Sequence, residues 1–456
     1  MVGRDNSMGK KHFVVLGLTW GDEGKGTTVE YLVKKYQSSW VIRFNGGPQA
    51  VHHVVEKDRW HDFSQFGSGT LVPSTKTFLA SGMLINIIDL IHEEHELTEK
   101  GIHDAAERLF LHGHCRLITP IHQMVNRLRE VKRGTKRYGS TGRGIGEAVR
   151  DYTKHEPLLF KDAFDKKKLR KKLAAIIERK SRDVQELLTK NKQAQDIYAD
   201  YHPYCSADFL TEVYHRFAMA YKHKTFTRLP RDKFIIFEGA QGALLDVNYG
   251  FYPYLTKTTT TVYALPTKDV IKIGVLRAYA HRHGKGPFMT VSPEIEKHHK
   301  ELHNKTNDWQ GPFRLGWFDA TLAKYGITLN GGVDWISLTN LDQLSNLGKI
   351  KVCTHYIYPG HLPAGWRGEQ KGKISIITGI KKVPHCKTKE RTEILSRCVP
   401  VYMELRGWNE NIGEVKRFKD LPQAAQEYVL FLERELRTPI KLISVNPRFD
   451  GKFERS

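Results

Sequence analysis

The stretch "LGLTWGDEGKGTTVEYLVKKY", residues 16–36, decides the fold, because it runs from an apolar segment through a glycine-rich loop into a helical pattern. Residues 12–18, "HFVVLGL", predict a buried strand, and residues 27–36 predict a helix before a second strand at 40–44. A strand, a glycine-rich loop and a helix in this order present backbone N–H groups at a helix N-terminus, where they can bind phosphate.

The loop departs from the standard phosphate-binding pattern G-x-x-x-x-G-K-[ST] at two positions. Counting back from Gly24 and Lys25, Thr19 stands at the first glycine position and Gly26 at the hydroxyl position. Asp22 lies inside the loop, where a carboxylate repels phosphate unless a metal ion or a proton transfer uses it. We therefore expect Asp22 to be a metal ligand, a general base, or both. The alternative is a glycine-rich turn with solvent-facing charges.

The rest of the chain mixes strand and helix patterns without a proline-rich linker, a low-complexity segment or an internal repeat. Further strands are predicted at residues 233–240, 270–276, 333–340, 349–358 and 441–446, and helices at 80–94, 162–195 and 421–437. This order predicts an α/β protein with a large, mostly parallel central sheet, flanking helices and helical insertions. We expect residues 1–10 to be a flexible tail and residues 11–456 to form a single domain.

Charge and composition limit the choice of partners. Lysine plus arginine exceeds aspartate plus glutamate by 72 − 50 = 22, which attracts polyanions or small anionic substrates. Much of the excess lies in "DKKKLRKKLAAIIERK", residues 165–180, where apolar residues at helical spacing favour a solvated helix face over a nucleic-acid surface. No RNA-binding signature with interleaved aromatic residues is present, so nucleic acid is not the expected partner.

The expected compartment is the cytoplasm. No apolar run approaches the roughly 20 residues that span a bilayer, and the first residues, "MVGRDNSMGKK", contain no apolar stretch typical of a secretion signal. We therefore expect no membrane association. The five cysteines are scattered without a C-x-x-C pair, which fits a reducing compartment, and "HGHC" at 112–115 has no second group of metal ligands at typical spacing.

A series of motifs resembles the adenylosuccinate synthetase family, whose members join IMP to aspartate at the expense of GTP. The motifs follow in family order across nearly the whole chain and include "WGDEGKG" at 20–26, "RFNGGPQAVHHVV" at 43–55, "GSTGRGIGEA" at 139–148, "FEGAQGALLDVNYGFYPYLT" at 237–256, "GKGPFMT" at 284–290, "LGWFDA" at 315–320, "LTNLDQL" at 338–344 and "PIKLISVNP" at 439–447. The resemblance implies a P-loop NTPase-like fold and a homodimer.

The resemblance also implies a mechanism with three catalytic residues, Asp22, Lys25 and His52. Asp22 would take the proton from N1 of the 6-oxopurine, so that O6 can attack the γ-phosphate of the co-substrate GTP. His52 would support the leaving phosphate and act as the acid. Mg²⁺ would be bound by Asp22, the phosphates and the backbone carbonyl of Val51, and an amine would then displace the new phosphate from the purine.

Further ligand-binding positions follow from the same resemblance. Those implied for GTP are Gly24, Gly26, Thr27, Asn340, Asp342, Ser444 and Asn446, and those implied for the purine nucleotide are Gln49, Ser140, Thr141, Lys154, Gln241 and Thr256. The Asp342 carboxylate would accept hydrogen bonds from N1–H and the 2-amino group of guanine, a donor pair that adenine does not offer. The alternative for Asp342 is a helix N-cap after a strand.

Several positions depart from the family, and the largest departure is in the loop that grips aspartate. Where the family carries T-T-G-R and further arginines, this chain has "NDWQGPFRLGW" at 307–317, with Asp308 and Gln310 in the altered part and Arg314 as the only retained arginine. Loss of a charge-assisted contact of roughly 1.5 to 3 kcal/mol weakens binding by about tenfold or more. The amine is therefore either aspartate held by other residues or a different amine.

Smaller departures also concern the substrates. Val51 and His283 replace a family glycine and valine, and the arginine that crosses the family dimer has no counterpart, Lys154 and His155 lying closest. Two alternatives to the family reaction follow. One is a relative that uses another purine nucleotide, such as dGMP, although retained Asp22 argues against it. The other is a purine-nucleotide-binding protein that does not ligate, against which retained Asp22, Lys25 and His52 argue.

Overall fold

The computed structural model describes residues 12–56, 59–299, 309–383 and 388–455, so the tail expected at 1–10 lies outside the described residues. A ten-stranded sheet forms the centre, in the order β21-β20-β15-β11-β1-β10-β2-β5-β7-β9, and only the pair β20–β21 is antiparallel. The predicted α/β fold with a large, mostly parallel sheet is confirmed. Its strands are β1 (His12–Gly17), β2 (Trp40–Arg43), β5 (Lys76–Leu79), β7 (Leu109–His112), β9 (Thr225–Phe226), β10 (Ile235–Gly242), β11 (Ile271–Arg277), β15 (Trp335–Thr339), β20 (Ile440–Ser444) and β21 (Lys452–Glu454).

The middle strands of this sheet are buried on both faces, as expected for parallel strands covered by helices. Helix α1 (Lys25–Tyr36) follows β1 directly and packs Val29, Leu32 and Val33 against side chains of the sheet. Helices α9 (Ala320–Leu329) and α11 (Gln423–Leu436) share a second apolar core with β15 and β20. The sequence therefore predicted the strands around the phosphate loop to within a few residues.

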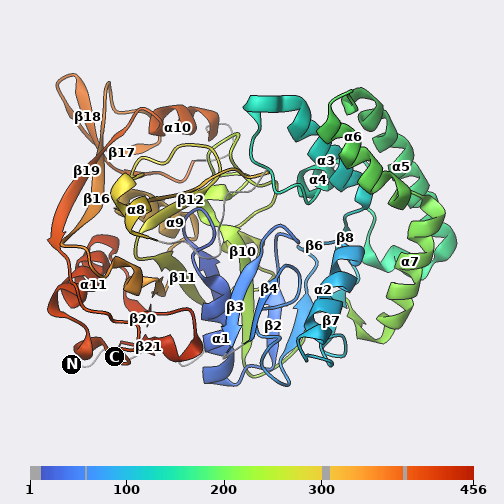
Figure 1. Ribbon diagram of the computed structural model, residues 1–456, viewed down its shortest axis with the longest axis horizontal. Coiled ribbons are helices and arrows are strands. Elements are labelled where there is room, and N and C mark those ends of the chain that lie inside the picture. The colour runs from blue at the N-terminus through green and yellow to red at the C-terminus, as the bar shows by residue number, and fades with distance from the viewer. Residues whose placement is uncertain (1–11, 57–58, 300–308, 384–387, 456) are drawn as a thin grey trace.

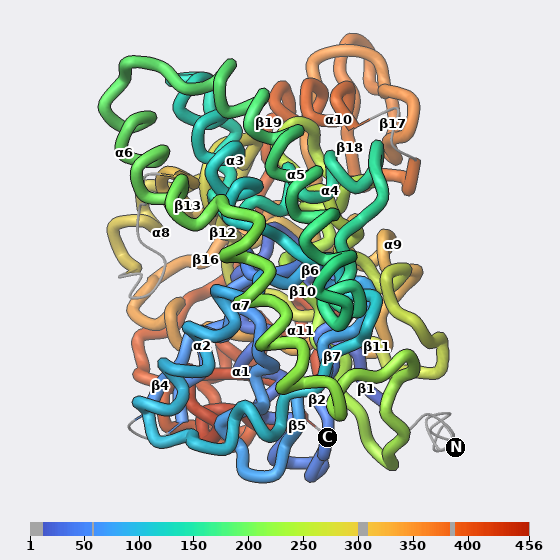
Figure 2. The backbone as a smooth tube through the Cα atoms, turned by 90° about the vertical axis from the view of Figure 1, so that its right-hand side faces the viewer, coloured from blue at the N-terminus to red at the C-terminus, as the bar shows by residue number. Residues whose placement is uncertain are grey.

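A layer of helices lies at one end of the sheet, at the right of Figure 1, and faces the viewer in Figure 2. It consists of α3 (Pro120–Arg133), α4 (Ile145–Lys154), α5 (Lys166–Leu187), α6 (Lys192–Tyr201) and α7 (Ala207–Ala220). In α5 the residues Leu169, Leu173 and Ile176 are buried, so the lysine-rich stretch forms an ordinary amphipathic helix. Among the helices of the described segments, none is long and apolar enough to cross a membrane.

Two predicted helices have different bounds in the structure, and an asparagine cap explains both. Residues 162–195 do not form one helical segment, because α5 ends at Leu187 and the Asn191 side chain accepts from the Ala194 N–H to begin α6. Residues 80–94 contain a turn and the short strand β6 (Leu84–Ile85), and α2 (Ile87–Glu99) starts only after Asn86. The Asn86 side chain accepts hydrogen bonds from the first turn, as a capping residue does.

A second, smaller sheet lies on the opposite side of the molecule from the helical layer (Figure 1). It contains β14 (Phe318–Asp319), β16 (Lys349–Tyr358), β17 (Trp366–Lys371), β18 (Ile374–Ile380) and β19 (Val399–Arg406), and α10 (Thr388–Leu395) packs beside it. Among the described residues, the other strands and α-helix are the hairpin β3 (His52–Glu56) and β4 (Arg59–Phe63), strand β8 (Arg116–Leu117) beside β6, the pair β12 (Ala280–His283) and β13 (Phe313–Gly316), and α8 (Pro293–His298).

Candidate active site

The glycine-rich loop leaves the carboxyl end of β1, in the middle of the parallel sheet, where α/β proteins bind ligands. Gly21, Asp22 and Gly24 all have positive φ angles, of 90°, 57° and 93°. A left-handed conformation is uncommon for a residue other than glycine, and such residues gather at functional sites. The Asp22 carboxylate makes no hydrogen bond or ion pair with another described residue. It is therefore free to take up a proton or bind a cation.

Glu23, the next residue, holds the loop together. Its buried carboxylate accepts from the Thr19 N–H at 2.9 Å and the Gly21 N–H at 3.0 Å, and it pairs with the Lys25 ammonium at 2.7 Å. Burial alone would raise the pKa of Glu23, but Lys25 and His281 lower it below its ordinary value. Glu23 is thus ionised, and a bound phosphate would compete with it for Lys25.

His52 lies at the start of β3, where its ring is buried and its two nitrogens have different surroundings. Its Nδ1 donates to Glu238 Oε1 at 2.5 Å, and its buried Nε2 has no protein partner among the described residues. Glu238 also accepts from the Ser68 N–H at 2.9 Å and from the Ser68 hydroxyl. Burial lowers the pKa of His52, whereas Arg43 and the donated hydrogen bonds outweigh burial and lower the pKa of Glu238 to about 2.

Gly26 explains why the hydroxyl of the standard loop is missing. A Cβ atom at this position would lie 3.0 Å from the His52 Cβ, 3.1 Å from the Ser68 hydroxyl and 3.2 Å from the His53 carbonyl oxygen. These distances are shorter than ordinary van der Waals contacts. The first turn of α1 is therefore packed against His52, and a serine or threonine at position 26 would displace it.

The structure brings together part of the predicted purine-nucleotide set. Gln49 Nε2 donates to Gln241 Oε1 at 3.3 Å, and Gln241, at the end of β10, has a positive φ of 61°. A Cβ on Gly47 would lie 2.8 Å from Ile145, so the 43–55 stretch meets the start of α4.

The other predicted members have local contacts. The Ser140 hydroxyl contacts Asn126 Oδ1 at 3.0 Å, and the Thr256 hydroxyl lies 3.4 Å from that of Thr258. Thr141 is half-buried beside Ser140, and Lys154 is exposed as the last residue of α4. Within the described segments, no side-chain hydrogen bond joins Thr141 or Lys154 to another member of the predicted set, so their roles stay predictions.

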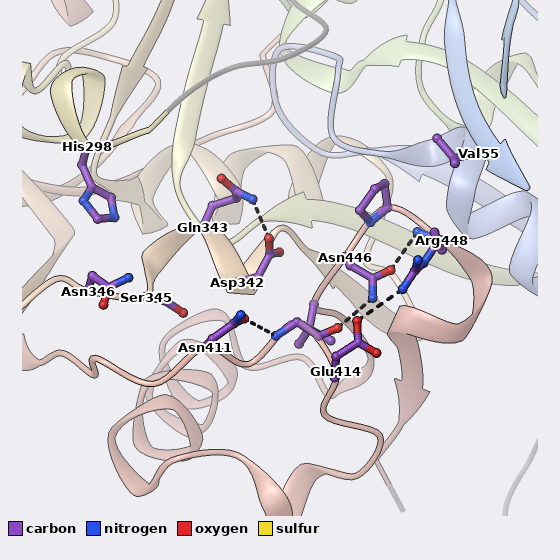
Figure 3. A pocket seen from close by; sticks show the side chains of 13 residues that line it. Val55, His298, Asp342, Gln343, Ser345, Asn346, Asn411, Glu414, Asn446 and Arg448 are labelled. Atoms are coloured by element: carbon purple, nitrogen blue, oxygen red, sulfur yellow. Dashed lines mark hydrogen bonds and ion pairs between the residues drawn. The ribbon is translucent and has the colours of Figure 1, made fainter. Parts of the chain in front are cut away.

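A pocket of about 610 Å³ contains two of the residues predicted to bind GTP, Asp342 and Asn446 (Figure 3). Gln343 Nε2 donates to the Asp342 carboxylate at 2.5 Å, and burial raises the pKa of Asp342 to about 6. Asn446 Nδ2 donates to the Gly413 carbonyl at 2.8 Å.

Two further residues predicted to bind GTP, Asn340 and Ser444, lie next to Asp342 and Asn446 in the motifs at 338–344 and 439–447. Asn340, with a φ of 58°, is the cap of the short 3₁₀ helix Leu341–Leu344, so Asp342 lies inside that helix and the N-cap alternative is wrong. The Ser444 hydroxyl donates to the Asn446 carbonyl at 2.8 Å. Motifs about 100 residues apart thus meet at one pocket. Thr27 lies in α1, where its hydroxyl donates to the Gly24 carbonyl at 3.2 Å.

The altered loop expected to hold the amine packs between the helical layer and β12. Asp308 lies outside the described residues, and the carbonyl oxygen of Gln310 lies against Gly139 and Gly284. Arg314 Nη2 donates to the carbonyls of Gly284 and Gly286, at 2.6 and 3.0 Å. The retained Arg314 therefore stabilises the turn that contains Gly284 and Gly286. His283, the other altered residue here, lies against the Phe313 ring.

The donors predicted for Mg²⁺ are the Asp22 carboxylate and the Val51 carbonyl. Among the described residues no group of three or more histidine, cysteine, aspartate or glutamate side chains could hold a metal ion. Mg²⁺ is usually bound through one or two carboxylates together with substrate phosphates and water. The Asp22 carboxylate, inside the predicted phosphate loop and without a partner among the described residues, fits that kind of site, and the Val51 carbonyl is the second predicted donor.

Sequence reasoning missed the roles of Glu23 and Glu238. Glu238 stands in the apolar run "FIIFEGA", and a carboxylate in a fully buried strand needs partners, which is the signal that could have found it. Glu23 has no such signal, because adjacent acidic residues in a glycine-rich turn are commonly exposed. Only the folded loop shows that Glu23 is buried and Asp22 is half-exposed.

Comparison with known proteins agrees with this geometry. The family model "Adenylosuccinate synthetase" matches residues 14–451. The chain is similar to the adenylosuccinate synthetases of Geobacter sp. (strain M21), at 32% identity, and Geotalea daltonii, at 33% identity, with 96% of both chains covered in each case.

Two solved structures have the same fold. A fully ligated adenylosuccinate synthetase from Plasmodium falciparum matches with a TM-score of 0.76 and 26% identity, over 98% of this chain and 100% of that one. The cyanophage S-2L succinoaminodeoxyadenylate synthetase, bound to dGMP and dATP, has a TM-score of 0.54 and 16% identity, which shows the fold alone. The phosphate loop, its neighbouring histidine and the match along nearly the whole chain lead to one conclusion: the chain belongs to the adenylosuccinate synthetase family.

Proposed function

We propose that the protein is a GTP-dependent ligase that joins IMP to L-aspartate and forms adenylosuccinate, GDP and phosphate. The observation that carries the proposal is that two side chains suited to proton transfer lie around one loop. The Asp22 carboxylate and the buried Nε2 of His52, beside the first turn of α1, have no hydrogen-bond partner among the residues that the structure describes. A protein that only binds nucleotides needs neither group.

In the first half of the reaction, Asp22 takes the N1 proton of IMP. The O6 atom gains electron density and attacks the γ-phosphorus of GTP, while the bond from that phosphorus to the bridging oxygen breaks and GDP leaves. In the second half, the amino nitrogen of aspartate attacks C6, the phosphate leaves with O6, and the nitrogen loses a proton. The oxygen is a poor leaving group until it is phosphorylated, so the order of the two halves is fixed by chemistry.

His52 and Lys25 serve the transferred phosphate. Burial keeps the imidazole neutral on its own, but phosphate oxygens near Nε2 would favour the imidazolium, because an opposite charge within a few ångströms stabilises the charged form. Glu238 accepts from Nδ1 and would stabilise that positive charge. Lys25, buried beside the loop, would exchange part of its contact with Glu23 for phosphate oxygens.

Asp342 would select guanine in the pocket it shares with Asn446. The carboxylate accepts and does not donate when it is ionised, which suits N1–H and the 2-amino group of guanine. Gln343 donates to one carboxylate oxygen and fixes its orientation. Adenine would meet a buried acceptor without a donor, and an unpaired buried acceptor costs about 1 to 3 kcal/mol.

We further propose that Asp22 and the Val51 carbonyl hold Mg²⁺, which when bound neutralises phosphate charge. The protein is proposed to act in the cytoplasm, since the cysteines of its described part, Cys115, Cys205, Cys353 and Cys398, are all free thiols. A homodimer is proposed from family membership. Aspartate is the proposed amine, although the retained Arg314 donates to backbone carbonyls, and the relatives favour IMP and aspartate over dGMP or a different amine.

The test is phosphate release from GTP in the presence of Mg²⁺ and IMP, with and without aspartate, followed together with the ultraviolet change of a succinylated adenine. We expect both signals to require IMP and aspartate. The variant Asp22→Asn should abolish both while GTP still binds. GTP turnover that does not depend on aspartate, or turnover that requires dGMP or another amine, would overturn the proposed function.

A further inference from the structure

Three consecutive carbonyl groups of the phosphate loop are each held by a side chain from a different strand. The Gly21 carbonyl accepts from His281 Nε2, the Asp22 carbonyl from Arg277 Nε at 2.7 Å, and the Glu23 carbonyl from the Thr339 hydroxyl at 2.6 Å. His281 belongs to β12, Arg277 to the end of β11 and Thr339 to the end of β15. All three side chains are buried.

These contacts fix the direction of the loop's N–H groups. In a trans peptide the carbonyl and the following N–H point to opposite sides of the chain. Because the carbonyls of residues 21, 22 and 23 face the three strands, the N–H groups of Asp22, Glu23 and Gly24 face away from them. Within the described part of the chain, none of these three N–H groups donates to a protein acceptor. Successive free N–H groups of this kind form an anion-binding concavity.

His281 is the most constrained of the three donors. Its ring is 2% exposed and stacks on Phe313, with 5.7 Å between ring centroids and 28° between ring planes. Donation to a carbonyl requires hydrogen on Nε2, so the bond selects one tautomer. The Arg277 guanidinium lies 5.4 Å from the same Phe313 ring and also donates to the Tyr279 hydroxyl at 2.8 Å. Neither donor can move without repacking its neighbours.

We propose that His281, together with Arg277 and Thr339, is a positioning residue that keeps the phosphate loop in its anion-binding conformation and Asp22 in its left-handed one. This inference rests on the proposed function, because it assigns the loop to GTP phosphates. None of the three side chains touches the phosphates or the purine in this role. They act through the backbone of residues 21–23. Their loss therefore weakens the binding of phosphate and at the same time displaces the Asp22 carboxylate.

The test compares His281→Leu with His281→Gln in the full-length protein. Leucine removes the donor, whereas glutamine can place an amide N–H near the position of Nε2. GTP affinity is measured by titration calorimetry with Mg²⁺, and kcat by the ligation assay. We expect His281→Leu to weaken GTP binding by about tenfold and to lower kcat by about tenfold or more, and His281→Gln to stay within about threefold of the parent in both.

A second pair of variants keeps the test decisive if His281→Leu does not fold. Thr339→Val removes the hydroxyl at nearly constant volume, and Thr321→Val is the matched control, because the buried Thr321 hydroxyl donates at 3.2 Å to the Thr354 carbonyl, away from the loop. Thr339→Val should weaken GTP binding severalfold, and Thr321→Val should not. Unchanged GTP affinity in both His281→Leu and Thr339→Val would overturn the inference, as would equal losses in Thr339→Val and Thr321→Val.

The calorimetric readout separates this inference from the proposed function. If the parent protein binds GTP but does not ligate IMP and aspartate, the proposed function fails, while the affinities of the variants still decide whether the three donors position the loop.

Discussion

Replacing Glu238 by glutamine tests the pairing of His52 with its acceptor. The carboxylate is fully buried, and the positive charge of Arg43 together with the hydrogen bonds from His52 and Ser68 lowers its pKa from 4.5 to about 2. Because each pKa unit corresponds to 1.36 kcal/mol, the ionised group contributes about 3 kcal/mol to folding near neutral pH. Glutamine keeps the size of the side chain but removes the charge, so we expect a comparable loss in the free energy of unfolding.

The sign of the pH dependence follows from the lowered pKa. The contribution of Glu238 is present above about pH 4.5 and is lost as the pH falls towards 2, because the native carboxylate must then be protonated. The Glu238→Gln variant should lack this part of the acid dependence. Chemical denaturation at several pH values measures both the loss and its dependence on pH.

The same substitution should slow catalysis by about 100-fold or more, since His52 loses the charged acceptor that orients its ring and stabilises its imidazolium. The matched control is Glu93→Gln. Glu93 is also buried and accepts from the Ser64 hydroxyl and the Gln65 N–H, at 2.7 and 2.8 Å, but does not contact His52. Glu93→Gln should lose stability and keep kcat near that of the parent. Equal losses of kcat in the two variants, or a parent-like kcat in Glu238→Gln, would refute the reasoning.

Three further predictions concern other parts of the site. Gly26→Ala should lower kcat at least tenfold, because the new Cβ would lie 3.0 Å from the His52 Cβ and displace that side chain. Steady-state kinetics measures the loss, the unfolding midpoint should stay unchanged, and a parent-like kcat would contradict the prediction. Asp342→Asn should lower the preference for GTP over ATP at least tenfold in competition assays. In the parent protein the KM for GTP should rise as the pH falls below about 6, because Asp342 then takes up a proton. A constant KM for GTP from pH 5 to 7 would argue against this role of Asp342. Arg314→Ala should reduce the free energy of unfolding by about 1 to 3 kcal/mol in denaturation experiments, because the carbonyls of Gly284 and Gly286 lose their donor. A change confined to the KM for aspartate would instead indicate that the guanidinium binds the substrate.

The sequence predicted those parts of the molecule that depend on local pattern. Continuous apolar runs predicted the buried parallel strands, and the glycines before residue 25 predicted the phosphate loop at the end of β1. The start predicted at residue 80 and the single helical stretch predicted at 162–195 were wrong, because apolar periodicity does not show where an asparagine side chain caps a helix. Asn86 and Asn191 decide those starts, although each looks like an ordinary polar residue in the sequence.

Contacts between distant segments could not be predicted in the same way. His281 and Arg277 lie about 260 residues after the loop, and their side chains meet its carbonyls only because β11 pairs directly with β1. The predicted strand at 270–276 ends before both residues, and the sequence does not show which backbone their side chains contact. The partner of His52 was hidden for the same reason, since Glu238 reaches it from β10, the other neighbour of β1.

These contacts also account for the loop's departure from the standard pattern. A standard loop uses the hydroxyl after the lysine, but here that space is taken by His52, which packs on Gly26. Because His52 lies this close to the first helical turn, a side chain at position 26 would have to displace His52 or Ser68, and glycine avoids that displacement. Asp22, held in a left-handed conformation inside the loop, then stands as the carboxylate available to take a proton or bind a cation. Gly26, one of the two departures from the motif, therefore leaves room for His52, and a Gly26→Ser variant that restores the hydroxyl of the standard loop should lose ligase activity.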